Sequence, residues 1–306
     1  MNGRRVLATL IRREFWEHRG LWAAPLVTAG LLVLMTFFTG GSAGAMRIQV
    51  NGREAQFLGM MSGPAQEKFF GVFIGALIVP QLVVALVVLF FYLLDSLYSE
   101  RKDRSILFWK SLPVSDAMTV ASKAVVALLA VPLLVWLLSL LVSVLCTAAL
   151  AIKVAGTPYA ALATWHTGIW MLVQGTLLLN MLVAALWYAP IAAFLLLVSA
   201  FARRAVFLWA VAPAAILVML EHNSLGTRHV AGFITYRLGG FFQQMGMSMN
   251  RKASPNAQAA VSEITQIYQK LDVAPLLMNV DLWLGVAAAG LMLYGAVRLR
   301  RWRDDT

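Results

Sequence analysis

The sequence has few charged residues for its length. Only 13% of its 306 residues are Asp, Glu, Lys or Arg, whereas 60% are apolar. A water-soluble domain carries about a quarter charged residues. This composition therefore excludes an ordinary soluble domain and predicts a helical membrane protein with several spans. No polar stretch is long enough to form a second globular domain.

The sequence also has little of what catalytic and metal sites require. A single cysteine, Cys146, excludes an intrachain disulfide bond. The pattern GxxxxGK[ST] is absent, so this chain cannot hold nucleotide phosphates in a P-loop, and neither HExxH nor metal-spaced Cys/His pairs occur. Residues 40–44, GGSAG, match the GxSxG nucleophile motif by letters only. A membrane helix rather than a strand is predicted before them, so we interpret them as a loop.

Two histidines and a carboxylate lie close together near the end of one apolar run. His222, His229 and Glu221 could form a metal site, but histidines at a membrane boundary are more often solvated or hydrogen-bonded. We predict no metal there. The net charge of +11 raises the question of nucleic-acid binding. The basic residues cluster at the ends of apolar runs, which indicates contact with membrane lipids and no nucleic acid.

Six apolar runs are long enough to cross a bilayer, which needs about 20 helical residues. The third and fourth are longer than a bilayer requires, and Pro132 and Pro190 are the expected kink sites within them. The first run is too long for a signal peptide, so we interpret it as an uncleaved anchor. The predicted spans are residues 21–39, 71–94, 120–151, 168–200, 205–220 and 281–298.

The distribution of lysine and arginine predicts the orientation. Sixteen of these residues fall in the segments that face the same side as the N-terminus, and nine fall in the longer segments on the other side. Both termini are therefore predicted to be cytoplasmic. Residues 221–280 form the longest segment on the outer side. The chain divides into an N-terminal helix, 1–20, and a six-span domain, 21–306.

Residues 1–20 have the pattern of an amphipathic helix. Leu10 and Phe15 fall on its apolar side, whereas Arg5 and Arg12 fall on the opposite side. Such a basic helix lies in the membrane interface, held by apolar burial and by anionic lipid.

The centres of the predicted spans contain no ionisable residue. Ionisable groups inside the membrane are the usual sign of a proton or ion pathway, and their absence weakens that class of function. The polar side chains at depth are Gln81, Gln174 and Asn180. They could line a substrate path, but hydrogen bonding between helices is the more common role. Small residues at 285–290, GVAAAG, predict a close helix–helix contact.

The segment between the second and third spans, residues 95–119, is unusually rich in charge and aromatic side chains. Charges of both signs and apolar residues at spacing three predict a short amphipathic helix that ends before Pro113. Ser115 or Asp116 is expected to cap the next helix. Mixed charges together with Phe108 and Trp109 favour contact with a protein over rest on the lipid surface.

The run YSERKDRSILFWKSLPVSD, followed by Lys123, resembles the coupling segment of type-2 ABC exporter permeases. Four features match the pattern of that family: an acidic–basic pair, a leucine-containing stretch, a proline with a polar residue, and a later lysine. Arg104 and Ser105 stand where a glycine is common in that family. The N-terminal amphipathic helix, the six spans and the large outer segment before the last span also fit the family layout.

This resemblance implies a permease of the bacterial inner membrane that works by alternating access. It pairs with a second permease, either the same chain or a different one, and with a separate subunit that binds ATP and Mg²⁺. The chain itself would then bind no cofactor and hydrolyse no ATP. The residues expected to dock the ATP-binding subunit are Glu100, Arg101, Lys102, Asp103, Arg104, Phe108, Trp109, Lys110, Arg12, Arg13 and Glu14. The alternatives are an ion-coupled carrier and a membrane-embedded enzyme or scaffold without an ATPase partner.

Overall fold

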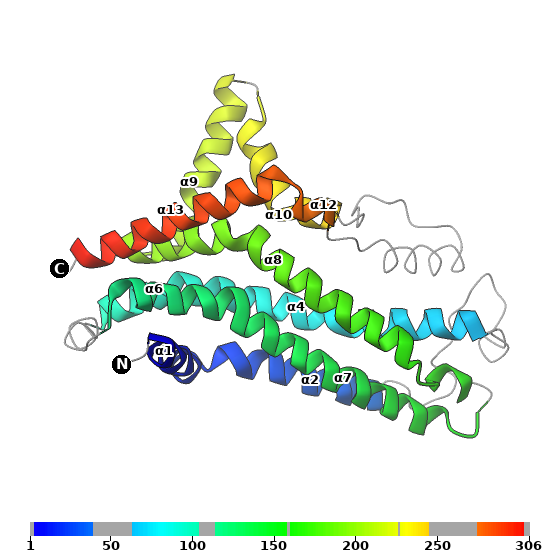
Figure 1. The fold of residues 1–306 in the computed structure, drawn as a ribbon. Coiled ribbons are helices and arrows are strands. Elements are labelled where there is room, and N and C mark those ends of the chain that lie inside the picture. Colours follow the sequence, from blue (N-terminus) through cyan, green and yellow to red (C-terminus); the bar gives the residue numbers. More distant parts are fainter. Residues whose placement is uncertain are drawn as a thin grey trace.

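Long helices make up the fold, as Figure 1 shows. The computed structural model describes residues 3–38, 63–103, 114–157, 160–225, 227–244 and 274–302, and these contain helices and no strands. Six helical stretches among them are long and apolar enough to cross a membrane, which confirms the predicted fold class. They are α2 (Gly20–Phe38), α4 (Gly63–Lys102), α6 with η1 and α7 (Asp116–Val154), α8 (Thr167–Phe201), α9 (Val206–Leu220) and α13 (Val280–Trp302).

The second span is longer than the apolar run that predicts it. α4 begins at Gly63 and continues without a break through the charged residues to Lys102. Ser96, Leu97 and Glu100 are buried on this extension, so tertiary packing holds the helix beyond the apolar run. Residues 95–102 therefore belong to α4 and do not form part of a separate helix. Residues 104–113 lie outside the described part.

The third span contains the irregularity expected near Pro132. Ser115 caps α6 (Asp116–Val125) and accepts a hydrogen bond from the Met118 amide at 3.2 Å. A π-helical turn, η1 (Val126–Ala130), then leads into α7 (Val131–Val154). Proline lacks an amide hydrogen, and a π turn is one way in which a helix accommodates the missing bond. The predicted Ser115 cap is confirmed.

α8 and α13 approach each other through small side chains. Ala189 and Ala193 of α8 and Ala289 of α13 are buried in one cluster. In a bilayer such residues allow backbones to come close, and van der Waals packing then stabilises the pair. The close contact predicted for residues 285–290 is confirmed.

The N-terminal helix runs across the long helices. α1 (Gly3–Glu17) is seen almost along its axis in Figure 1, whereas α2 lies beside the other spans. Leu10 is buried and Ile11 and Phe15 pack on the main core, while Arg5 and Arg12 are exposed. α1 therefore has the apolar side and the basic side that the sequence predicts. The Trp22 indole donates a hydrogen bond to the Phe15 carbonyl at 3.2 Å across the α1–α2 elbow.

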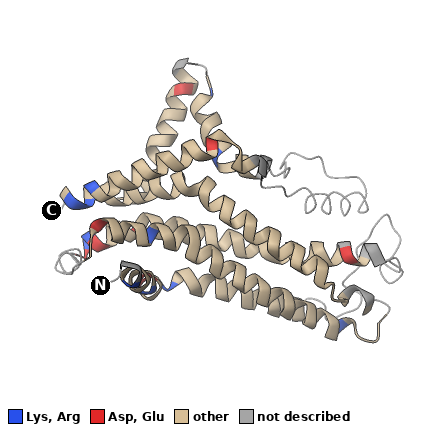
Figure 2. Ribbon diagram, viewed as in Figure 1, with Lys and Arg blue, Asp and Glu red and all other residues tan. Residues whose placement is uncertain are grey.

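Both termini lie at the same end of the bundle, which we call the terminal end, and the opposite end is the distal end (Figure 1). Charged residues gather near the ends of the helices, and the middle of the long helices is free of them (Figure 2). α9 rises away from the long helices, and α10 (His229–Gln244) returns beside it after the turn η3 (Glu221–Leu225).

A buried arginine fastens α10 to the distal part of the bundle. Arg237 is 7% exposed, and its guanidinium lies 4.7 Å from the ring centre of Trp187 on α8. It donates to the Asp281 carbonyl of α13 at 3.1 Å, and the Trp187 indole donates to the Arg237 carbonyl at 3.0 Å. The guanidinium rests against Gly285, where a Cβ atom would lie 1.7 Å from its Nη2.

We expect Gly285→Ala to lower the melting temperature, Tm, of the purified protein. The new methyl group must displace the Arg237 guanidinium from its buried position, and forced overpacking costs about 1–3 kcal/mol. Gly290→Ala on the same helix is the matched control, because nothing lies within 4 Å of its Cβ position. The effect of Gly285→Ala should shrink in an Arg237→Ala background. An equal loss of Tm in both backgrounds would contradict this contact.

Candidate functional site

The last turn of α4 places a carboxylate among three cations from other parts of the chain. Glu100, 5% exposed, accepts from Arg13 at 3.0 Å, lies 3.1 Å from the Lys123 ammonium and pairs with Arg300. These cations come from α1, α6 and α13. We call the whole group the terminal charge network; its members are Arg13, Glu14, Glu17, Glu100, Asp116, Lys123 and Arg300.

Lys123 is the most deeply buried cation of this network. Its side chain is fully buried, and its ammonium donates to both oxygens of Glu14, at 2.9 and 3.1 Å. The Tyr92 hydroxyl of α4 donates to the same carboxylate at 3.0 Å. Lys123 thus joins α6 to α1 through Glu14 and to α4 through Glu100.

Two further ion pairs, one at Arg300 and one at Arg13, complete the network. Arg300, near the end of α13, also donates to Asp116 in the first turn of α6 at 3.0 Å. Arg13 donates to Glu17 one turn further along α1, at 2.6 and 3.0 Å. Burial by itself would lower the pKa of Arg13, but Glu17 and Glu100 raise it above its ordinary value. Arg13 therefore stays charged.

These ion pairs do not by themselves stabilise the fold strongly. Moving a charge out of water costs several kcal/mol, and a buried pair roughly recovers that cost. Breaking one pair is different, because the remaining charge has no counterion. The network therefore fixes one arrangement of α1, α4, α6 and α13 and makes partial separation of these helices unfavourable.

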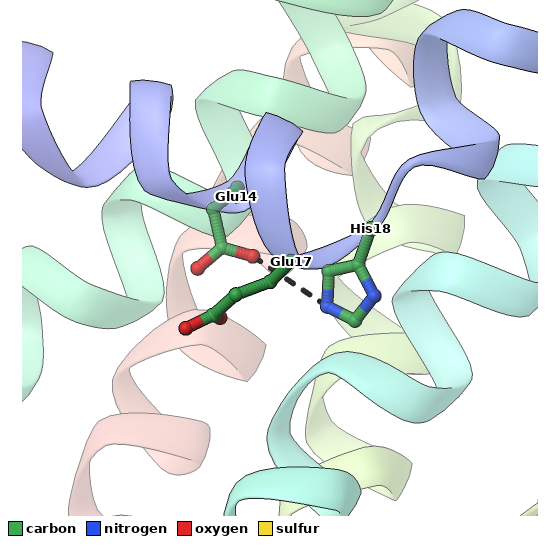
Figure 3. A group of neighbouring side chains, drawn as sticks. All are labelled: Glu14, Glu17 and His18. Atoms are coloured by element: carbon green, nitrogen blue, oxygen red, sulfur yellow. Dashed lines mark ion pairs between the residues drawn. The ribbon is translucent and has the colours of Figure 1, made fainter.

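Glu14, Glu17 and His18 lie close together at the end of α1, as a metal site would require (Figure 3). His18 lies 3.8 Å from Glu14, but burial lowers the pKa of the imidazole, with Glu14 acting in the opposite direction. The imidazole is thus neutral at pH 7. Both Glu14 oxygens already face the Lys123 ammonium, so the charge that a metal ion would neutralise has its counterion within the chain.

The residues predicted to dock a partner separate into three groups. Glu100, Glu14 and Arg13 belong to the terminal charge network. The Arg101 guanidinium donates to the Ser199 and Ala202 carbonyls at the end of α8, at 2.5 and 2.8 Å. The exposed members are Lys102, Asp103 and Arg12, the last stacked on Trp16. Arg104, Phe108, Trp109 and Lys110 lie outside the described residues.

The side chains of the three polar residues of the possible substrate path all form hydrogen bonds with groups on the helices. The Gln174 side chain accepts from Ser139 of α7 at 2.9 Å, which is a bond between two spans. Gln81 and Asn180 donate to carbonyls of their own helices, at 3.1 and 2.8 Å. Among described residues, Gln81 is fully buried and its Oε1 atom has no hydrogen-bond partner. Among the described residues, the Oδ1 atom of Asn180 is also buried without a hydrogen-bond partner, so two of the three have an unused acceptor.

Glu221 serves as a cap rather than as the centre of a histidine cluster. Its carboxylate accepts from the Val230 amide at 2.7 Å and from the Thr227 hydroxyl at 2.9 Å, and the His229 amide also donates to it. A carboxylate at this position neutralises the positive end of α10. His222 and His229 are exposed.

Comparisons of the chain with protein-family models, with curated proteins and with solved structures found no match. The function therefore has to be inferred from the residues and contacts of the chain itself.

Sequence reasoning selected three of the seven members of the terminal charge network. It selected Glu100, Arg13 and Glu14, but as surface residues. It noted Lys123 only as part of the family pattern and Asp116 only as a cap, and it gave Arg300 and Tyr92 no role. The available signal was position: each of these charges lies within about eight residues of the end of an apolar run, and helix ends from distant parts of the chain meet there.

We expect Lys123→Met to destabilise the protein by about 3–5 kcal/mol, because it leaves the buried Glu14 without its cation. Adding Glu14→Gln should recover most of that loss, since the pair is then removed together. Thermal unfolding of the purified single and double variants measures both effects. Lys102→Met, which removes an exposed cation, should leave Tm unchanged. Losses that simply add in the double variant would show that the two side chains are not coupled.

Proposed function

We propose that the chain is the permease subunit of an ATP-driven exporter of the type-2 ABC class, in a bacterial inner membrane with both termini cytoplasmic. The observation that carries the proposal is the position of Glu100. It lies at the end of α4, just before the segment that resembles a coupling helix, and it binds cations of α1, α6 and α13. A partner that moves this segment would act on all four helices together.

The mechanism would be alternating access. A separate subunit would bind ATP and Mg²⁺, because the chain has no P-loop of its own. Closure of two such subunits would displace the segment between α4 and α6, and the terminal charge network would pass this displacement to α1 and α13. Transitions of this kind need packed elements that move as units rather than deform continuously.

The second permease subunit would cover apolar surface that a single chain leaves exposed. Trp209, Ile216 and Leu217 of α9 are each about half exposed, and α9 stands apart from the other spans in Figure 1. Lipid alone could cover this helix as well. The proposal therefore places the partner permease near α9 without deciding between a second copy and a different chain.

An ion-coupled carrier fits the described residues less well. Its proton or ion pathway would need ionisable groups within the membrane. The described charges instead lie at the ends of the helices (Figure 2), and those of the terminal charge network neutralise one another. The other alternative is a membrane-embedded enzyme or a scaffold. A search for the partner protein distinguishes it from the proposed exporter.

The proposed orientation predicts which engineered cysteines an impermeant thiol reagent can reach in intact cells. In a Cys146→Ser background, Ala155→Cys at the distal end should react, and Lys102→Cys at the terminal end should react only after permeabilisation. Both native residues are exposed. Labelling in the opposite order would place the coupling segment outside and would refute the proposal.

Affinity purification of the full chain should recover a protein that contains GxxxxGK[ST]. Exchanging the charges of Lys102 and Asp103 should reduce its recovery by roughly tenfold, because contacts between charged side chains of two proteins are weakened by reversal. The Tm should not change, since both side chains are exposed. Arg228→Glu, which changes an exposed charge between η3 and α10, is the control.

If the unchanged chain recovers no P-loop protein, the ABC assignment is wrong. If it does, but the exchanged variant binds that protein as well as the parent does, the assignment stands and the docking residues are wrong.

A further inference from the structure

A groove of about 710 Å³ opens where the α1–α2 elbow meets α4 and the start of α9. Its floor and walls are apolar, with Val87, Phe91 and Phe207 each about half exposed. Its rim is polar and includes Glu17, Arg19 and Asp95. The groove thus combines a hydrocarbon-like surface with a charged rim at the level where the apolar run of α4 ends.

The apolar wall and one acid of the rim belong to a single stripe of α4. Val87, Phe91 and Asp95 are spaced by four residues, so they lie on the same face of the helix. At 1.5 Å per residue the stripe extends about 12 Å from Val87 to Asp95. An alkyl chain that lies along Val87 and Phe91 therefore brings a polar head to Asp95.

Asp95 is available to pair with a positive charge from a ligand. It is exposed, and no cation of the described chain pairs with it. It is close enough to His18 to favour the protonated imidazole, but burial lowers the pKa of that histidine, so His18 supplies no positive charge at pH 7. Glu17, the other acid, is already held by Arg13.

Arg19 supplies the opposite charge on the same rim. It is exposed at the α1–α2 elbow. A ligand that satisfies both sides therefore carries an ammonium group for Asp95 and a phosphate for Arg19, attached to an alkyl chain. This is the chemistry of a phospholipid with a primary amine in its head group.

We propose that this groove is a binding site for an aminophospholipid such as phosphatidylethanolamine, with its ammonium at Asp95, its phosphate at Arg19 and an acyl chain along Val87 and Phe91. The basic face of α1 attracts anionic lipid through charge alone. The groove differs, because it selects for an amine. The site does not depend on the proposed transport function.

Native mass spectrometry of the full-length chain, titrated with phosphatidylethanolamine, phosphatidylcholine or phosphatidylglycerol, tests the preference. The unchanged chain should retain phosphatidylethanolamine most strongly. Asp95→Asn should weaken that retention by about threefold to fivefold, which is the range of a partly exposed charge pair, and Asp95→Glu should largely restore it. Asp103→Asn removes an exposed acid of the same segment outside the groove and should have no effect.

A photoactivatable phosphatidylethanolamine locates the site in vesicles that contain the protein. Its cross-links should map to peptides that carry Val87–Phe91 or Val206–Phe207, and their yield should fall by a similar threefold to fivefold in Asp95→Asn, while its Tm stays unchanged. Equal retention of all three lipids, or a preference that survives Asp95→Asn, overturns the proposal. Cross-links confined to other helices also overturn it, as does shielding of the groove by a second copy of the chain.

Discussion

Burial of the Glu100 carboxylate among cations from three other segments is the constraint on which the terminal end depends. Together with the buried Ser96 and Leu97, it holds α4 helical beyond its apolar run. The side chain is 5% exposed, so its charge must be met within the protein. Arg13, Lys123 and Arg300 meet it, and each fixes a different helix relative to α4.

The spans and their order could be predicted because they follow from local composition. Apolar runs, the irregularity near Pro132 and the Ser115 cap depend on residues that are close together in the sequence, and the structure agrees with each. α8 continues through Pro190 as one helix. The terminal charge network could not be predicted in the same way. Glu100 and Arg300 are 200 residues apart, and Glu14 and Lys123 are 109 residues apart. Charged residues beside apolar runs normally face water or lipid head groups, so the sequence favoured exposure.

The same reasoning explains the outcome at Arg237. Arg237 lies within residues 221–280, the longest segment that the sequence places on the outer side. The guanidinium is instead buried against Trp187 and Gly285, residues of two other helices. A cation on an aromatic face gains electrostatic energy without a carboxylate. An aromatic partner such as Trp187 leaves no charge pattern in the sequence. Gly285 could be recognised only as part of a run of small residues.

α13 connects these two sites mechanically. Gly285 and Asp281 contact Arg237 towards the distal end, and Arg300 binds Glu100 and Asp116 at the terminal end. Fifteen residues of helix between 285 and 300 span about 22 Å. Between them, Ala289 packs closely on Ala189 and Ala193 of α8. In the proposed transport cycle, a displacement of the terminal charge network would therefore reach the part of α13 that contacts α10, because α13 is one continuous helix between the two sites.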